Sequence, residues 1–185
     1  TFAIGIFFFF LFVRKIMGKE VALFATAYLS VVPTYLFRTT AGFSDKESLA
    51  LMFMFMALFA FFKSLEQVKK VPAMVWGIIS GIVTVSMGFV WGGVQFILFS
   101  IGLFVLIEIL FDKFSDANFW SYLGWFLTTV GILAIGWPEK YQLQSMIVSH
   151  PMIPMFFAAL AGIIQRGIHH IKLKEKLKDR FSHGT

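Results

Sequence analysis

Two acidic residues and an arginine stand close together in the stretch RTTAGFSDKESLA, residues 38–50, between two long apolar runs. Asp45 and Glu47 offer hard oxygen ligands, and no histidine or cysteine lies nearby, so the pair favours Mg²⁺ or Mn²⁺ over softer metals. In a loop or a frayed first helical turn, these carboxylates can converge on one cation. Arg38 can pair with a carboxylate or a phosphate oxygen. We therefore consider a metal site formed by the two carboxylates and supported by the positive charge of Arg38.

The same stretch has a purely structural interpretation. Ser44-x-x-Glu47 before the apolar run LALMFMFMALFAFF matches a capping box, in which Ser44 caps the helix and Glu47 bonds back to its amide. Asp45 would complement the positive end of the helix dipole. However, the uncharged run 48–62 spans only about 22 Å as a helix, which places the charged loop low in the outer membrane interface. Unpaired charges there cost energy, so both interpretations stay open.

The composition is that of a membrane protein. Hydrophobic residues make up 58% of the 185, Phe contributes 25 of them, and the mean hydropathy is +0.82. The uncharged run 71–107 is too long for one span and should divide near Gly92–Gly93. We predict an all-α, polytopic membrane helix bundle of about seven spans, forming a transmembrane domain over 1–165, before a basic cytoplasmic segment, 166–185. The expected spans are roughly 1–13, 21–37, 48–62, 72–91, 94–111, 117–137 and 146–165.

The lysines and arginines give an orientation. Seven alternating spans put thirteen of the 16 on one side and leave only Arg38, Lys46 and Lys140 on the other. By the positive-inside rule, the basic side is cytoplasmic, so we expect a multi-pass plasma membrane protein with the acidic loop facing the exterior. The bases border apolar spans rather than a soluble surface, which argues against nucleic acid as a partner. The final IHHIKLKEKLKDRF suits a helix end in the anionic cytoplasmic interface.

Three further features have structural explanations. Gly77-x3-Gly81 is typical of close helix contact within a membrane. Trp91-Gly92-Gly93 fits an interfacial aromatic residue followed by a tight turn. His150, next to Pro151, favours packing in a kinked helix, with a contact to substrate as the alternative. The absence of cysteine excludes disulfides and thiolate metal sites within this chain.

Two motifs in this chain resemble a known family. P-x-Y-L-x-R-T-x-A-G-F-x-D-x-E, from Pro33 to Glu47, is similar to the second external loop of the catalytic subunit of oligosaccharyltransferase, most of all the archaeal form. Trp91 to Ile97 resembles the W-G-G-x-x-F-I stretch at the family's next external turn. The resemblance implies part of a GT-C-type membrane glycosyltransferase. Such an enzyme moves an oligosaccharide from a polyprenyl (di)phosphate carrier to Asn in Asn-x-Ser/Thr.

The resemblance also implies roles for residues and partners. Asp45 and Glu47 become ligands of a divalent cation, Mn²⁺ or Mg²⁺, and Arg38 a supporting catalytic group. The implied partners are a lipid-linked oligosaccharide, an acceptor polypeptide and membrane lipids. The family's first acidic ligand and its acceptor-binding motif match nothing in this chain, so we expect a fragment that is inactive alone. Ser44 stands where the family usually has an aromatic residue, which keeps the capping interpretation open.

Two rival functions remain. Another polyprenyl-phosphate-dependent glycosyltransferase of the same architecture would differ in its acceptor. A membrane transporter is the weaker rival, because ion-coupled transport usually places ionisable groups near mid-membrane and these spans carry essentially none.

Overall fold

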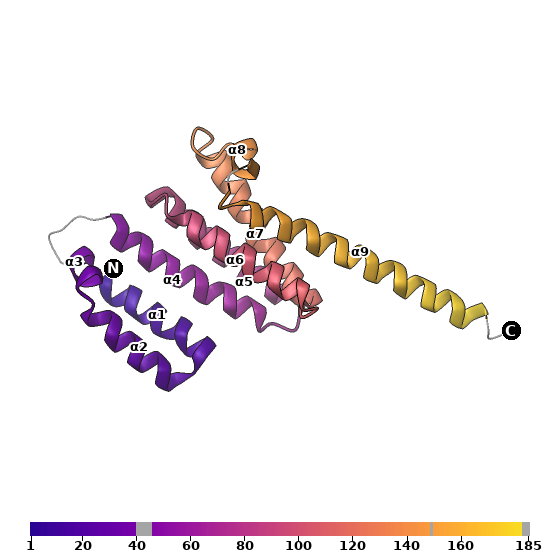
Figure 1. Cartoon of the computed structure of the whole chain (residues 1–185), viewed down its shortest axis with the longest axis horizontal. Coiled ribbons are helices and arrows are strands. Elements are labelled where there is room, and N and C mark those ends of the chain that lie inside the picture. Colours follow the sequence, from indigo (N-terminus) through magenta and orange to yellow (C-terminus); the bar gives the residue numbers. More distant parts are fainter. Residues whose placement is uncertain (40–45, 149, 183–185) are drawn as a thin grey trace.

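The fold is all-helical wherever it is described. A computed structural model describes residues 1–39, 46–148 and 150–182 (Figure 1). Within these ranges, every regular element is an α-helix, which confirms the predicted fold class. The helices are α1 (Phe2–Met17), α2 (Lys19–Val31), α3 (Pro33–Thr39), α4 (Lys46–Leu65), α5 (Lys70–Val90), α6 (Val94–Leu110), α7 (Asp116–Gly136), α8 (Leu143–Val148) and α9 (Ile153–Ser182).

Several helices are suited to a bilayer. In the described ranges, α4, α5 and α7 are long and apolar enough to cross a membrane, and α2 with α3 makes a fourth if that bent pair is one span. Helix α6 and the stretch Ile153–Ile168 of α9 are shorter apolar helices. The chain is therefore a multi-pass membrane protein, whereas the count of seven spans stays a prediction.

Prolines interrupt two of the expected spans. The range 21–37 bends by 64° between α2 and α3, where Val32 is extended and Pro33 begins the next helix. A proline disfavours helical backbone in the residue before it, which explains the break. The range 146–165 is divided between α8 and α9, with Pro151 in the connection and Pro154 in the first turn of α9. A first-turn proline removes no intrahelical hydrogen bond. Helix α9 then continues without a break into the expected cytoplasmic segment, as far as Ser182.

Helix α5 lies at the centre, packed against α4 and α7, while α1 packs on the outer side of α4 and α6 against α9. Glycine permits the closest contact: a Cβ on Gly77 would lie 2.1 Å from the carbonyl oxygen of Ser121 in α7. The contact predicted from Gly77 and Gly81 is thus present. Trp125 is fully buried beside it, 5.9 Å from the ring of Phe61.

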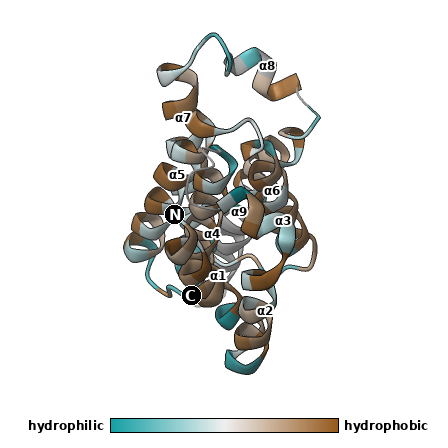
Figure 2. Ribbon diagram, turned by 90° about the vertical axis from the view of Figure 1, so that its left-hand side faces the viewer, coloured by the Kyte–Doolittle hydropathy of each residue, from teal (hydrophilic) through white to brown (hydrophobic). Residues whose placement is uncertain are grey.

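Ion pairs join several helices at one end of the bundle. Glu66 pairs with Lys15 and Lys63, so the α4–α5 loop is tied to α1. Asp116 pairs with Lys70 at 3.1 Å and Arg166 at 2.8 Å, which connects α5, α7 and α9. Figure 2 shows hydrophilic residues at both ends of the bundle, at the start of α2 on this end and in the α7–α8 loop at the opposite end. Hydrophobic residues lie along the helices between them. Clustered bases and opposing acids therefore share one end, because short loops make successive helices alternate in direction.

Candidate functional site

Arg38 and Glu47 meet at the opposite end of the bundle. The guanidinium Nη1 of Arg38, in the last turn of α3, donates to Oε2 of Glu47, in the first turn of α4. Each charge suits its helix terminus, because a helix dipole favours cations at the C-terminal end and anions at the N-terminal end. The two side chains are 39% and 27% exposed. The pair is therefore reachable from outside yet held by two helices.

The elements around the pair fix its position. Tyr35 of α3 is buried and lies 5.5 Å from the ring of Phe2 in α1. Thr39 donates a side-chain hydrogen bond of 2.7 Å to the carbonyl of Tyr35, which closes the end of α3. The hydroxyls of Thr1 and Ser48 lie 2.9 Å apart and join α1 to the start of α4. Three helices thus converge where the sequence predicted a site.

Asp45, the other expected metal ligand, lies outside the described residues, as does Ser44 of the capping box. The predicted metal site and its capping alternative therefore both stay predictions. Within residues 1–39, 46–148 and 150–182, no cluster of three or more acidic or histidine side chains could hold a metal ion. Of the three residues expected to act together, the structure brings Arg38 and Glu47 into contact.

The Arg38–Glu47 pair combines groups that bind metal ions and phosphate. A carboxylate has two oxygens and about four acceptor positions, so it can accept several partners at once. Glutamate oxygens are suitable ligands for Mg²⁺ or Mn²⁺, although a complete coordination shell needs donors beyond Glu47. Arg38 offers five N–H donors in a fork that fits carboxylate or phosphate. A carboxylate beside a guanidinium suits phosphate chemistry, and a metal ion at this position stays a prediction.

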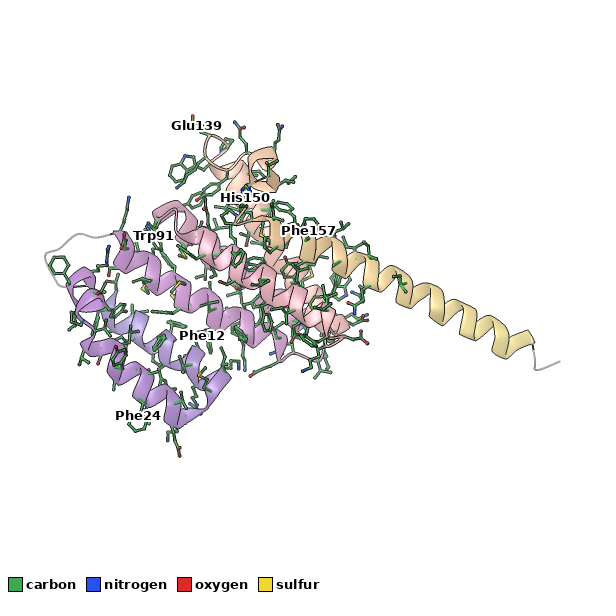
Figure 3. All side chains as sticks on the ribbon, viewed as in Figure 1. Phe12, Phe24, Trp91, Glu139, His150 and Phe157 are labelled. Atoms are coloured by element: carbon green, nitrogen blue, oxygen red, sulfur yellow. The ribbon has the colours of Figure 1, made fainter. Side chains whose placement is uncertain are left out.

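A groove lies beside the turn between α5 and α6. This turn is at the same end of the bundle as Arg38 and Glu47, because α5 runs back along α4. Its volume is about 460 Å³. Its lining comes from the turn, from α6 and from the segment before α9: Gly92, Gly93, Gln95, Phe96, Phe99, His150 and Pro151. Figure 3 labels Trp91 and His150, which come from these separate segments.

Glycine shapes this turn. A Cβ on Gly93 would lie 2.1 Å from the indole of Trp91, so the ring can fold over the turn only because position 93 has no side chain. Phe96 and Phe99 are 69% and 40% exposed along the groove. His150 is exposed and lines the groove, in place of the packing role that the sequence favoured.

Sequence reasoning missed this groove. Gln95 and Phe99 carried no signal of their own, since they belong to a long uncharged run. The available signal was positional: the predicted topology put residues 92–93 and the segment near His150 at the same membrane face.

Comparisons with known proteins agree on one family. The family model described as "Oligosaccharyl transferase STT3, N-terminal" matches residues 3–172. A dolichyl-diphosphooligosaccharide–protein glycosyltransferase subunit STT3 from Schizosaccharomyces pombe is 28% identical over 121 residues, which cover 65% of this chain and 15% of that protein. The corresponding subunit of Saccharomyces cerevisiae is 25% identical over 115 residues, covering 62% and 16%. That of Dictyostelium discoideum is 25% identical over 111 residues, covering 60% and 15%. The matched region thus spans about one sixth of these relatives.

Proposed function

We propose, because the chain belongs to the oligosaccharyl transferase STT3 family, that it is part of a GT-C-type membrane glycosyltransferase of protein N-glycosylation. The reaction would transfer an oligosaccharide from a polyprenyl (di)phosphate carrier to the Asn of an Asn-x-Ser/Thr acceptor. The observation that carries the proposal is the Arg38–Glu47 pair, which lies inside the family-like stretch Pro33–Glu47 and within the matched residues 3–172.

Glu47 and Asp45 would hold a divalent cation, Mn²⁺ or Mg²⁺. When bound, such a cation supplies positive charge to the phosphate leaving group. Arg38, in contact with Glu47, would bring the positive charge of its guanidinium to phosphate oxygens. Cleavage of a sugar–phosphate bond builds negative charge on the departing phosphate, so a fixed guanidinium stabilises the transition state more than the ground state.

The groove beside Trp91–Gly93 is the candidate site for the apolar carrier. Phe96 and Phe99 provide apolar contact area, while Gln95 and His150 offer polar groups at the groove. A lipid-linked substrate needs this combination, because its chain is apolar and its head is charged.

Orientation and origin belong to the same proposal. The acidic loop would face the exterior of a plasma membrane, supported by the thirteen-to-three distribution of bases. We infer an archaeal-type member from the form of the Pro33–Glu47 stretch. The transporter alternative is disfavoured, because the buried polar side chains among the described residues are serines and threonines rather than charged groups.

The direct test uses the full-length protein that contains this chain. It is purified with a lipid-linked oligosaccharide and a fluorescent peptide carrying Asn-x-Thr, and glycopeptide is measured by its shift on a gel. Transfer to Asn-x-Thr but not to a matched Gln-x-Thr peptide is expected. If the glycan moves only to a lipid or a sugar acceptor, the rival glycosyltransferase function is correct. Residues 1–185 alone are expected to transfer nothing.

A further inference from the structure

Helix α9 has two halves with different surroundings. It runs as one helix from Ile153 to Ser182 and leaves the bundle at the end that carries the clustered ion pairs (Figure 1). In the first half, Met155 is fully buried, and its carbonyl accepts a 2.6 Å hydrogen bond from Tyr122 of α7. The opposite face is exposed and apolar, with Leu160 at 55% and Ile168 at 49%. The first half therefore has a face toward the bundle and an apolar face outward, as a helix at the edge of a membrane bundle should.

The outward face of α9 changes from apolar to acidic after Ile171. Glu175 and Asp179 follow Ile168 by about two and three helical turns, so they occupy register positions on the face that is apolar before them. Hydrocarbon does not favour these acids, so α9 would leave the membrane here. The helix nevertheless continues to Ser182.

The second half carries its own apolar stripe. Leu173, Leu177 and Phe181 are spaced four residues apart, which places them on one face at register positions away from the two acids. Basic residues flank this stripe on both sides: Lys176 and Arg180 on one, Lys174 and Lys178 on the other. Residues 169–182 hold five Lys or Arg and two acids, a net charge of +3. The pattern is that of a helix that lies on an anionic surface.

We infer that residues 172–182 of α9 form a docking face for the anionic lipid surface at the end of the bundle where α9 leaves the membrane. The apolar stripe would enter the boundary between headgroups and acyl chains, and the flanking bases would contact lipid phosphates. Gly167 is exposed and has nothing within 4 Å of its Cβ position, so it is a suitable point for the helix to bend toward the surface. This inference is independent of the glycosyltransferase proposal.

The charge of the segment favours an anionic lipid surface over a second copy of the chain as its partner. Two such stripes packed together would set Lys and Arg against Lys and Arg, and like charges at an interface oppose association. An anionic bilayer instead attracts each basic residue near its surface, with roughly a fivefold gain in binding per residue. The segment is also joined directly to the apolar half of α9, which would hold it at headgroup level if that half lies in the membrane.

Spin labelling tests the inference, and the chain is suited to it because it contains no cysteine. The 185-residue chain would be reconstituted in phosphatidylcholine vesicles, with or without phosphatidylglycerol. Single labels are attached at Leu177→Cys, in the stripe, and at Asp179→Cys, on the opposite face. Accessibility to oxygen and to a water-soluble nickel chelate reports whether each label is in lipid or water. With phosphatidylglycerol, the label at 177 should move into lipid, the label at 179 should stay in water, and high salt should reverse the change.

Matched variants separate electrostatic docking from burial against protein. Lys176→Gln, beside the stripe, should reduce the equilibrium constant for lipid insertion roughly fivefold, whereas Lys172→Gln, on the face with the acids, should change it little. The inference is overturned if the label at 177 behaves identically in both kinds of vesicle. It is equally overturned if that label is shielded in phosphatidylcholine alone and becomes accessible on dilution of the protein, because a second copy would then cover the stripe.

Discussion

The guanidinium of Arg38 contacts the carboxylate of Glu47 across the break between α3 and α4. This contact joins a basic residue at one helix end to an acidic residue at the next helix start, beside the buried Tyr35. The pair is therefore both an element of the fold and the most specific chemical feature that the described residues offer. The first two predictions separate these roles.

Glu47→Gln in the full-length protein should reduce glycan transfer on the order of 10²- to 10³-fold, because a neutral amide replaces a charged oxygen ligand poorly. Raising Mn²⁺ or Mg²⁺ should partly restore the rate, and membrane insertion should be unchanged. Glutamine also serves in a capping box, so a purely structural Glu47 would leave transfer near the wild-type rate at every metal concentration.

Arg38→Gln should give a different pattern. Loss of the guanidinium should lower the transfer rate about 10²-fold, as for other preorganised charge contacts. The metal concentration required for half-maximal activity should not increase, because Glu47 keeps its carboxylate. Measuring the rate against metal concentration for both variants distinguishes them. An increased metal requirement in Arg38→Gln would show that the arginine acts only by positioning Glu47.

The two ends of the bundle should lie on opposite sides of the membrane. Val68, 92% exposed between α4 and α5, and Glu139, exposed between α7 and α8, are suitable sites for single cysteines. A membrane-impermeant maleimide added to intact cells should label Glu139→Cys but not Val68→Cys until the cells are opened. Labelling of both in intact cells would contradict the orientation inferred from the basic residues.

Gly77→Ala should destabilise the bundle by about 1 to 3 kcal/mol, since the new methyl group would meet the Ser121 backbone and force α5 away from α7. Gly131→Ala is the matched control, because nothing lies within 4 Å of its Cβ position. Thermal unfolding of detergent-solubilised protein, followed by helicity, measures both. Equal midpoints for the two variants would show that the α5–α7 contact is looser than described.

Glu66, at the end of the bundle that carries the clustered ion pairs, should make the free energy of unfolding depend on pH. The hydrogen bond from Lys15 holds the pKa of this carboxyl below its usual value, more than offsetting the opposing effect of burial. The resulting stabilisation is present above the unfolded pKa, near 4.5, and is lost as pH falls through the lower folded value. Because Glu66 is 49% exposed, the contribution should be only about 0 to 1 kcal/mol.

The measurement compares unfolding midpoints of wild type and Glu66→Gln from neutral pH down to the acid range. The difference between them should shrink as pH falls. Glu139→Gln, at the opposite end of the bundle, serves as the control for removing one carboxylate. A difference that stays constant with pH would exclude the Lys15–Glu66 contact as its source.

The sequence by itself determined the helical class, the membrane setting and the stretch that holds the candidate site. These follow from local properties: long apolar runs require helices in lipid, because every backbone polar group there needs an internal partner. The nearness of Arg38 and Glu47 was also largely local, since they lie nine positions apart around a short connection.

Only the tertiary structure decided which helices touch and which distant residues share a surface. Asp116 gathers Lys70 and Arg166 from two other helices, and His150 lines a groove with Phe96, far from it in sequence. The choice of α7 as the close neighbour of α5 depends on the fit of Gly77 against the Ser121 backbone. Such fits depend on the shapes of two surfaces together, whereas apolar periodicity records only that a surface is apolar. For that reason the groove and the ion-pair network could not be predicted, although the helices that form them could.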